Sequence, residues 1–191
     1  MIVSAFIFYS VYCRLRVFNG IVENSGSQVT EYVLMYKSIV NSLERAKGHL
    51  SLLYTFALIL RLPELVATTY ISLLKIKINY EHDEAYNQIL RNFYTMYTFI
   101  LLTAPAVIAG SVAAAVGDLR VIIHERLLLE RDEDYIPELE LFLSYVDGRP
   151  MQYMVFKIVP LDWSLPVIIF NICISYQIIV VQITNFIWCS R

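Results

Sequence analysis

The feature that most constrains this chain is its C-terminal stretch, because no charged residue lies between Asp162 and Arg191. A helix over residues 163–189 would be about 40 Å long at about 1.5 Å per residue. That length exceeds the hydrocarbon core of a bilayer, which is roughly 30 Å thick. The sequence therefore predicts a membrane-spanning helix at residues 163–189.

This predicted helix has one polar face. On a helical wheel, four polar side chains fall within one narrow sector that only Ile178 interrupts: Asn171, Ser175, Gln182 and Asn185. Side-chain amides are costly in lipid unless they meet water or a hydrogen-bond partner. We therefore expect this face to contact either a shared aqueous pore or polar groups on neighbouring helices of the same subunit.

The composition of the whole chain is that of a membrane protein. Of its 191 residues, 58% are hydrophobic and 17% are charged, which is too apolar for an ordinary soluble fold. The net charge of −2 gives no indication of nucleic-acid binding. Besides Cys13, the cysteines are Cys173 and Cys189 in the final predicted span, so no disulfide framework or zinc site is expected.

The motifs of several enzyme classes are absent from the sequence. It has no Gly-rich phosphate loop, no His-Glu-x-x-His zinc motif and no Gly-x-Ser-x-Gly nucleophile motif. Its three histidines are scattered along the chain. The sequence therefore predicts no enzyme, no catalytic residues, no cofactor and no metal site.

The chain is predicted to form one all-α domain over residues 1–191, a multi-pass transmembrane helical bundle with cytoplasmic helical extensions. Its periodicity predicts a partial helix at 1–13 that is too short to span, a cytoplasmic helix at 14–47, spans at about 48–74, 92–117 and 163–189, and a cytoplasmic segment at 118–160. Arg14 and Arg16 follow the first apolar segment directly, as at the cytoplasmic end of a membrane helix. We therefore expect the C-terminal half of a longer protein, with residues 75–91 and the C-terminus outside.

Polar groups inside the first two complete spans are candidates for a site. Arg61 and Glu64 share one helix face, where they can pair, and charges within a span also border cavities or functional sites. Pro63 lies between them, removes a backbone donor and predicts a local bend. In the next span, Tyr94 and Tyr97 belong either to an interfacial aromatic belt or to the rim of a ligand pocket.

Two local signals predict packing details. Ala106, Gly110 and Ala114 recur at four-residue spacing, which permits close helix contact in lipid. Asp162 or Ser164 is placed to cap the start of the final helix, since short polar side chains accept hydrogen bonds from the first free backbone amides.

A short motif in the final span carries a resemblance to a known family. Ser175-Tyr176, the five residues QIIVV and then Gln182-Ile183 resemble the Thr-Tyr-(five apolar)-Gln-Phe motif that closes insect gustatory receptors and, in related form, insect odorant receptors. The departures are Ser for Thr, Ile for Phe, and the polar Gln177 among the five apolar positions. The preceding segments are similar to the last three to four membrane helices of that family.

The resemblance implies a subunit of a ligand-gated cation channel, a taste receptor in which four subunits surround one pore and the last helix lines it. Gln182 would then form a polar ring, and Ile179 and Ile183 would form an apolar gate that closes by dewetting. The nearby pore-helix residues are Ser175, Tyr176 and Asn185. The implied partners are membrane lipid, a small-molecule tastant and further receptor subunits, identical or different, in a tetramer of the plasma membrane.

The ligand cavity is expected among the membrane helices, near four residues of the first two complete spans: Arg61, Glu64, Tyr94 and Tyr97. The alternative function is a polytopic transporter or a non-conducting structural membrane protein. A transporter is expected to show inverted repeats with interrupted helices in paired positions. The Pro160–Pro166 break before the last span has no convincing counterpart elsewhere in the sequence.

Overall fold

The computed structural model describes residues 2–24, 29–77, 82–132, 135–149, 151–155 and 159–189, with side chains at all of these except 73–77, 82–85 and 184–189. Within these ranges the chain is all-α apart from one short β-hairpin. The prediction of an all-α fold is therefore confirmed.

The elements follow one another as α1 Ile2–Asn24, α2 Val29–Lys77, α3 His82–Leu129, α4 Tyr135–Asp147, β1 Met154–Val155, β2 Val159–Pro160 and α5 Ser164–Cys189. β1 and β2 pair in antiparallel fashion, with Met154 opposite Pro160 and Val155 opposite Val159. By length and composition, α1, α2, α3 and α5 contain stretches apolar enough to cross a membrane.

The helices are longer than the segments predicted from apolar windows. α1 has 23 residues and does not end near Cys13, so the expectation that the first apolar segment is too short to span is wrong for the helix as a whole. The predicted helix at 14–47 is divided between α1 and α2, and α2 then continues through the predicted span at 48–74. An apolar window marks only the lipid-like part of a helix, whereas backbone hydrogen bonding continues through amphipathic flanks.

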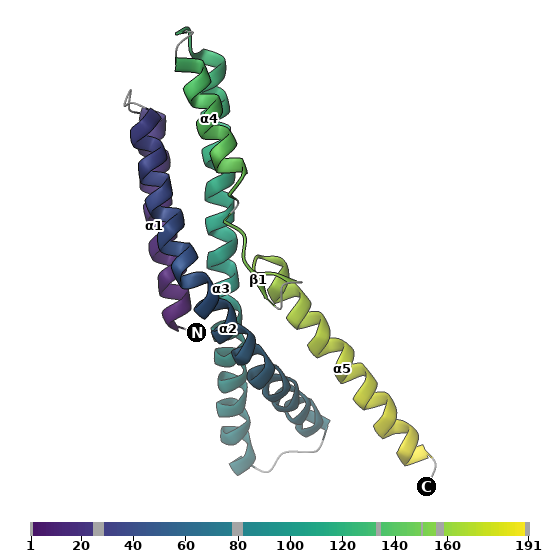
Figure 1. Cartoon of the computed structure of the whole chain (residues 1–191). Helices are drawn as coiled ribbons and strands as arrows, with labels where there is room; N and C mark the ends of the chain where they lie inside the picture. Colours follow the sequence, from purple (N-terminus) through teal and green to yellow (C-terminus); the bar gives the residue numbers. More distant parts are fainter. Residues whose placement is uncertain are drawn as a thin grey trace.

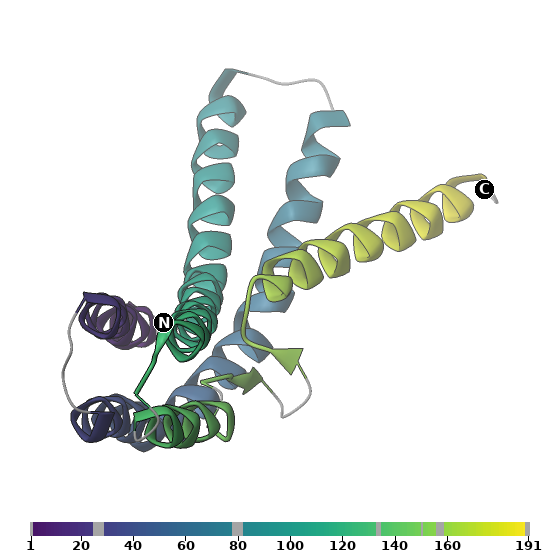
Figure 2. The same ribbon diagram turned by 90° about the horizontal axis from the view of Figure 1, so that it is seen from above.

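The helices form a packed end and a splayed end (Figure 1). α1, the first part of α2, the last part of α3 and α4 run side by side at the packed end. The end of α2, the start of α3 and the end of α5 lie at the opposite, splayed end. Seen from above, α5 projects away from the other helices (Figure 2).

An aromatic cluster fills the packed end and joins α1, α2 and α4. The ring of Phe142 lies edge-on to those of Phe18 and Tyr36, at centroid distances of 6.4 and 6.2 Å. Tyr32 and Tyr145 extend the cluster on either side. Edge-to-face pairs are favoured by the aromatic quadrupole, and large buried rings contribute much of a core's apolar area. The aromatic cluster therefore packs α1, α2 and α4 against one another at the packed end.

Polar contacts attach α3 to its neighbours. The Nδ2 of buried Asn19 in α1 donates to the carbonyl oxygen of Ala115 at 2.8 Å. The hydroxyl of Tyr54 in α2 donates to the carbonyl oxygen of Leu102. Both bonds are between a side chain and a helix backbone, so they fix how far each helix is shifted along α3.

The hairpin segment packs against α1 and α2 through Tyr153. Its ring lies edge-on to Phe8 at 4.9 Å, and its hydroxyl reaches the carbonyl oxygen of Leu43 at 3.5 Å. Lys47 lies over the same ring, 5.7 Å from its centroid. Burial raises the pKa of the Tyr153 phenol above its ordinary value, with a smaller contribution from nearby Glu44.

α5 starts against a glycine of α3. A Cβ at Gly110 would lie 2.6 Å from Cδ1 of Trp163 and 3.2 Å from its backbone nitrogen, so only glycine admits this contact. Ala106 and Gly110 are buried, as the predicted close approach requires, but the neighbour of Gly110 is Trp163, which precedes α5, and not a helix face. Ala114 is exposed, so no helix of the described chain covers it.

Asp162 caps the start of α5, as predicted. Its Oδ1 accepts a hydrogen bond from the backbone N–H of Ser164 at 2.8 Å and another from the Ser164 hydroxyl at 2.6 Å. Its own carbonyl oxygen accepts the first helical bond, from the N–H of Leu165 at 3.2 Å. The cap satisfies donors that a helix start leaves free, and it sets the residue at which α5 begins.

Candidate functional site

α5 packs against the rest of the chain along a single stripe. Its buried residues recur every four positions, at Leu165, Ile169, Cys173 and Gln177. The first two, with Ile172, line a small apolar space shared with α2 and the hairpin. This four-residue repeat is typical of one helix lying along another.

The polar residues of α5 lie on the opposite side of that helix. Asn171, Ser175 and Gln182 are all exposed. Ser175 lies two residues from Cys173 and two from Gln177. At about 100° per residue, this places its side chain about 200° around the helix axis from one and from the other. Within the described chain, therefore, no other helix covers this polar face, and the alternative of bonds to neighbouring helices of the same chain is not observed for these three residues. The side chain of Asn185 lies outside the described residues.

The predicted gate residues flank the polar face. Ile179 and Ile183 are both exposed, and they lie between the polar face and the buried stripe. Tyr176 is exposed on the same flank and borders a cavity beside α2. The structure thus brings the motif residues onto one side of α5, with the polar and apolar members on adjoining strips.

Gln177 is the exception among the polar residues of α5. It is only 7% exposed, and its Nε2 donates to the carbonyl oxygen of Val66 in α2 at 3.2 Å. Its Oε1 is buried without a hydrogen-bond partner among the described residues. The sequence marks Gln177 as a departure from the family motif, but its partner is 111 positions away in the chain and gives no local signal.

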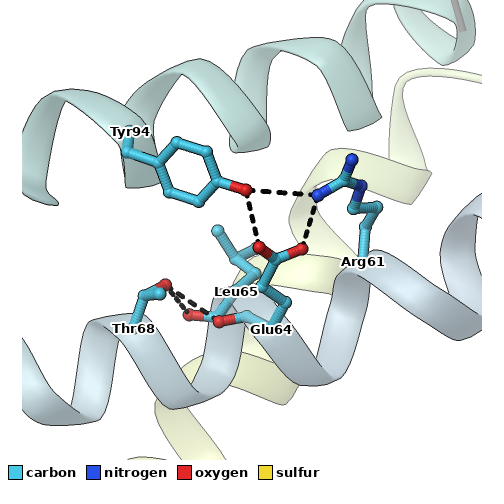
Figure 3. A network of polar contacts seen from close by, with 5 residues as sticks. All are labelled: Arg61, Glu64, Leu65, Thr68 and Tyr94. Atoms are coloured by element: carbon cyan, nitrogen blue, oxygen red, sulfur yellow. Dashed lines mark hydrogen bonds and ion pairs between the residues drawn. The ribbon is translucent and has the colours of Figure 1, made fainter.

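Three of the predicted ligand residues form one network between α2 and α3 (Figure 3). Nη1 of Arg61 contacts Oε2 of Glu64 at 2.6 Å and donates to the Tyr94 hydroxyl oxygen at 3.2 Å. The Tyr94 hydroxyl donates to Oε1 of Glu64 at 2.6 Å. The predicted ion pair is therefore present, and a tyrosine from the next helix closes it into a ring of three contacts.

A cavity of about 360 Å³ opens beside this network. Its polar lining comes from Arg61, Tyr94, Tyr97 and Thr98, and its apolar lining from Ile2, Val3, Leu101 and Leu102. This volume lies in the range of small-molecule sites, which combine apolar walls with a few polar groups. Three of the four predicted ligand residues, Arg61, Tyr94 and Tyr97, line the cavity. Glu64 does not line it, but its carboxylate contacts Arg61 and Tyr94.

A second cavity, of about 470 Å³, separates α2 from α5. Pro63, Val66 and Tyr70 line it from α2, and Ile172 and Tyr176 line it from α5. The sequence does not predict it, because its walls are ordinary apolar residues of two spans that are distant in the chain. Pro63 lies inside α2, which continues through it.

Comparison of the chain with protein-family models and with curated proteins gives no match. Within the described ranges, no three His, Cys, Asp or Glu residues are grouped so that they could hold a metal ion. The polar groups described around the two cavities are hydroxyl groups, the Gln177 amide and the Arg61–Glu64 ion pair.

Proposed function

We propose that this chain is a membrane-embedded subunit of a ligand-gated cation channel of the insect gustatory receptor type. Four of its helices are long and apolar enough to cross a bilayer. The observation that carries the proposal is the polar face of α5, the exposed strip of Asn171, Ser175 and Gln182 opposite the side that packs on α2. In a membrane, such a strip is stable only against water or polar groups.

Assembly of several subunits accounts for this strip. If α5 of each subunit turns its polar face toward a common axis, the amides surround a water-filled path and the packed stripe faces the subunit's own α2. We propose a homo- or heterotetramer in the plasma membrane, with the C-terminus outside. The splayed end of the chain, where α2, α3 and α5 diverge, would then be the extracellular end.

Gating follows from the two adjoining strips of α5. A ring of Ile179 and Ile183 closes a narrow pore by excluding water, while a ring of Gln182 hydrates passing ions. A rotation of α5 by roughly 60–100°, the angle that separates Gln182 from Ile179 and Ile183 on the helix, exchanges which strip faces the axis. A ligand favours the conducting state only by the amount by which it binds that state more tightly.

The cavity beside the Arg61 network is the proposed ligand site. Arg61 and Glu64 neutralise each other there, and the remaining polar groups are the hydroxyls of Tyr94, Tyr97 and Thr98. Such a lining suits an uncharged small molecule that both donates and accepts hydrogen bonds, with an apolar part against the leucines. This is the proposed tastant class.

The test is ion selectivity in cells that express the full chain together with any partner subunit needed for current. Gln182→Glu should raise the permeability of cations relative to chloride, and Gln182→Lys should lower it, because each places one charge per subunit in the pore. Gln182→Asn keeps the amide and serves as the matched control, with an unchanged ratio. Equal ratios for the Glu and Lys variants in assembled channels would remove Gln182 from the pore.

A further inference from the structure

Gln177 is placed on the side of α5 where an amide is least expected. Its neighbours in the buried stripe are Ile169 and Cys173, and the polar face lies on the other side of the helix. Its only described hydrogen bond is the 3.2 Å contact from Nε2 to the carbonyl oxygen of Val66. This bond is a polar link between the proposed pore helix and α2.

The link reaches α2 beside the proposed ligand network. Val66 follows Glu64 by two residues, within one turn of α2, and the Glu64 carboxylate contacts Arg61 of the same helix and Tyr94 of α3. A change in that network that shifts or rotates this turn therefore shifts the carbonyl that holds α5. The Arg61 network and the Gln177 bond are therefore connected through one turn of α2.

An amide ties two helices together in lipid in a way that an apolar side chain does not. A Leu or Met side chain at this position would have a similar free energy against α2 and against acyl chains, because lipid tails are as apolar as the helix surface. The Gln177 amide, by contrast, loses its partner if α5 leaves α2, and an unpaired amide in hydrocarbon is strongly disfavoured.

We propose that Gln177 is a positioning residue, a latch that holds α5 against α2 and thereby keeps the pore wide. The inference rests on the proposed function, since it assigns the pore to the polar face of α5. Because that face lies opposite the latch, motion of α5 away from α2 carries Gln182 and the gate isoleucines toward the axis. Release of the latch therefore narrows the pore.

The substitution that tests the latch is mild for folding. Gln177→Met keeps the length of the side chain, removes the donor and also removes the buried Oε1 that lacks a described partner. The Val66 carbonyl lies inside a continuous helix, whose backbone groups pair with one another. If Gln177 serves only to fill its buried position, the folding of the Gln177→Met variant should change little.

The matched control is Thr69→Val in the same part of α2. The Thr69 hydroxyl donates to the carbonyl oxygen of Leu65 at 2.6 Å, within its own helix. Its replacement also removes one side-chain hydrogen bond to a backbone carbonyl, but it leaves the link between α2 and α5 intact. The two variants thus differ in whether the lost bond joins two helices.

The first measurement is the distance between α2 and α5 in the full chain in lipid nanodiscs. Spin labels at the exposed positions Leu60→Cys and Ile174→Cys report it by pulsed electron paramagnetic resonance, with the native cysteines replaced in every sample. Gln177→Met should lengthen and broaden the distance distribution, and Thr69→Val should leave it unchanged. An unchanged distance distribution in Gln177→Met overturns the proposed latch, whether or not the chain conducts ions.

The second measurement is potassium flux from proteoliposomes without added ligand. Gln177→Met should reduce the basal flux severalfold, while Thr69→Val keeps it. A flux in Gln177→Met that equals or exceeds that of the unmodified chain contradicts a latch that widens the pore. Absence of flux in the unmodified chain would count against the proposed channel, and the distance measurement would still decide whether Gln177 holds α5.

Discussion

The contact between Gly110 and Trp163 allows a quantitative prediction, because it places the start of α5 on α3. In Gly110→Ala the new Cβ would lie 2.6 Å from Cδ1 of Trp163, against 3.4 Å or more in ordinary contacts, an overlap of 3.4 − 2.6 = 0.8 Å. The Trp163 backbone nitrogen, at 3.2 Å, limits how far the residue can retreat. Overpacking of this kind costs about 1–3 kcal/mol.

Alanine also gains about 0.5–1 kcal/mol over glycine inside a helix, so Gly110→Ala should be destabilised by roughly 0–2.5 kcal/mol. Gly117, seven residues further along α3, is the matched control, because a Cβ there meets nothing within 4 Å. Gly117→Ala should therefore be stabilised by about 0.5–1 kcal/mol. The gap between the two variants equals the overpacking term alone, about 1–3 kcal/mol.

The assay is thermal unfolding of the purified full chain in one detergent, followed by circular dichroism. For a chain of this size, a gap of 1–3 kcal/mol corresponds to roughly 2–12 °C between the two midpoints. Trp163→Ala should remove most of the penalty of Gly110→Ala in the double variant, since the clashing ring is gone and only the backbone nitrogen at 3.2 Å stays close. Equal midpoints for Gly110→Ala and Gly117→Ala, or a penalty that is undiminished without the Trp163 ring, would refute the reasoning.

Three further predictions concern buried polar groups. Asn19→Asp places a carboxylate against the Ala115 carbonyl in place of an amide donor, and should lower the unfolding free energy by about 1–3 kcal/mol, measured by thermal unfolding. Tyr54→Phe removes the hydrogen bond to Leu102 and should cost about 1 kcal/mol in the same assay, and an unchanged midpoint would contradict this bond. Burial raises the pKa of Tyr153, so its contribution to stability is complete below the ordinary tyrosine value of about 10 and is lost as pH rises through the raised value. Alkaline unfolding should accordingly begin at higher pH in Tyr153→Phe, and a midpoint that does not move would exclude this residue as a cause.

Local signals in the sequence predict the ends and the faces of the final helix well. The uncharged stretch and Asp162 together predict the final helix at 163–189, and α5 runs from Ser164 to Cys189. The wheel separates Ser175 from Gln177, and these two lie on opposite sides of α5. Each of these predictions depends only on residues within a few turns of one helix.

Predictions that depend on distant segments succeed only in part. Charge and spacing indicate the pairing of Arg61 with Glu64, but the third member, Tyr94, joins from α3 because of how the two helices cross. The small-residue pattern around Gly110 indicates a close approach without identifying Trp163, whose position depends on the hairpin before α5. The partner of Gln177 is set by tertiary packing alone.

In the proposed channel, the polar face of α5 contacts water, while the exposed apolar side of α5 opposite Ile179 and Ile183 contacts lipid or protein. Cysteine scanning with a charged, membrane-impermeant thiol reagent tests it in the full chain, after replacement of the native cysteines. We expect reaction at three positions of the polar face and none at three exposed apolar positions on the side opposite the gate isoleucines: Asn171, Ser175 and Gln182 against Phe170, Ile174 and Val181. Equal reactivity of the two sets, or protection of the polar face, would contradict the account.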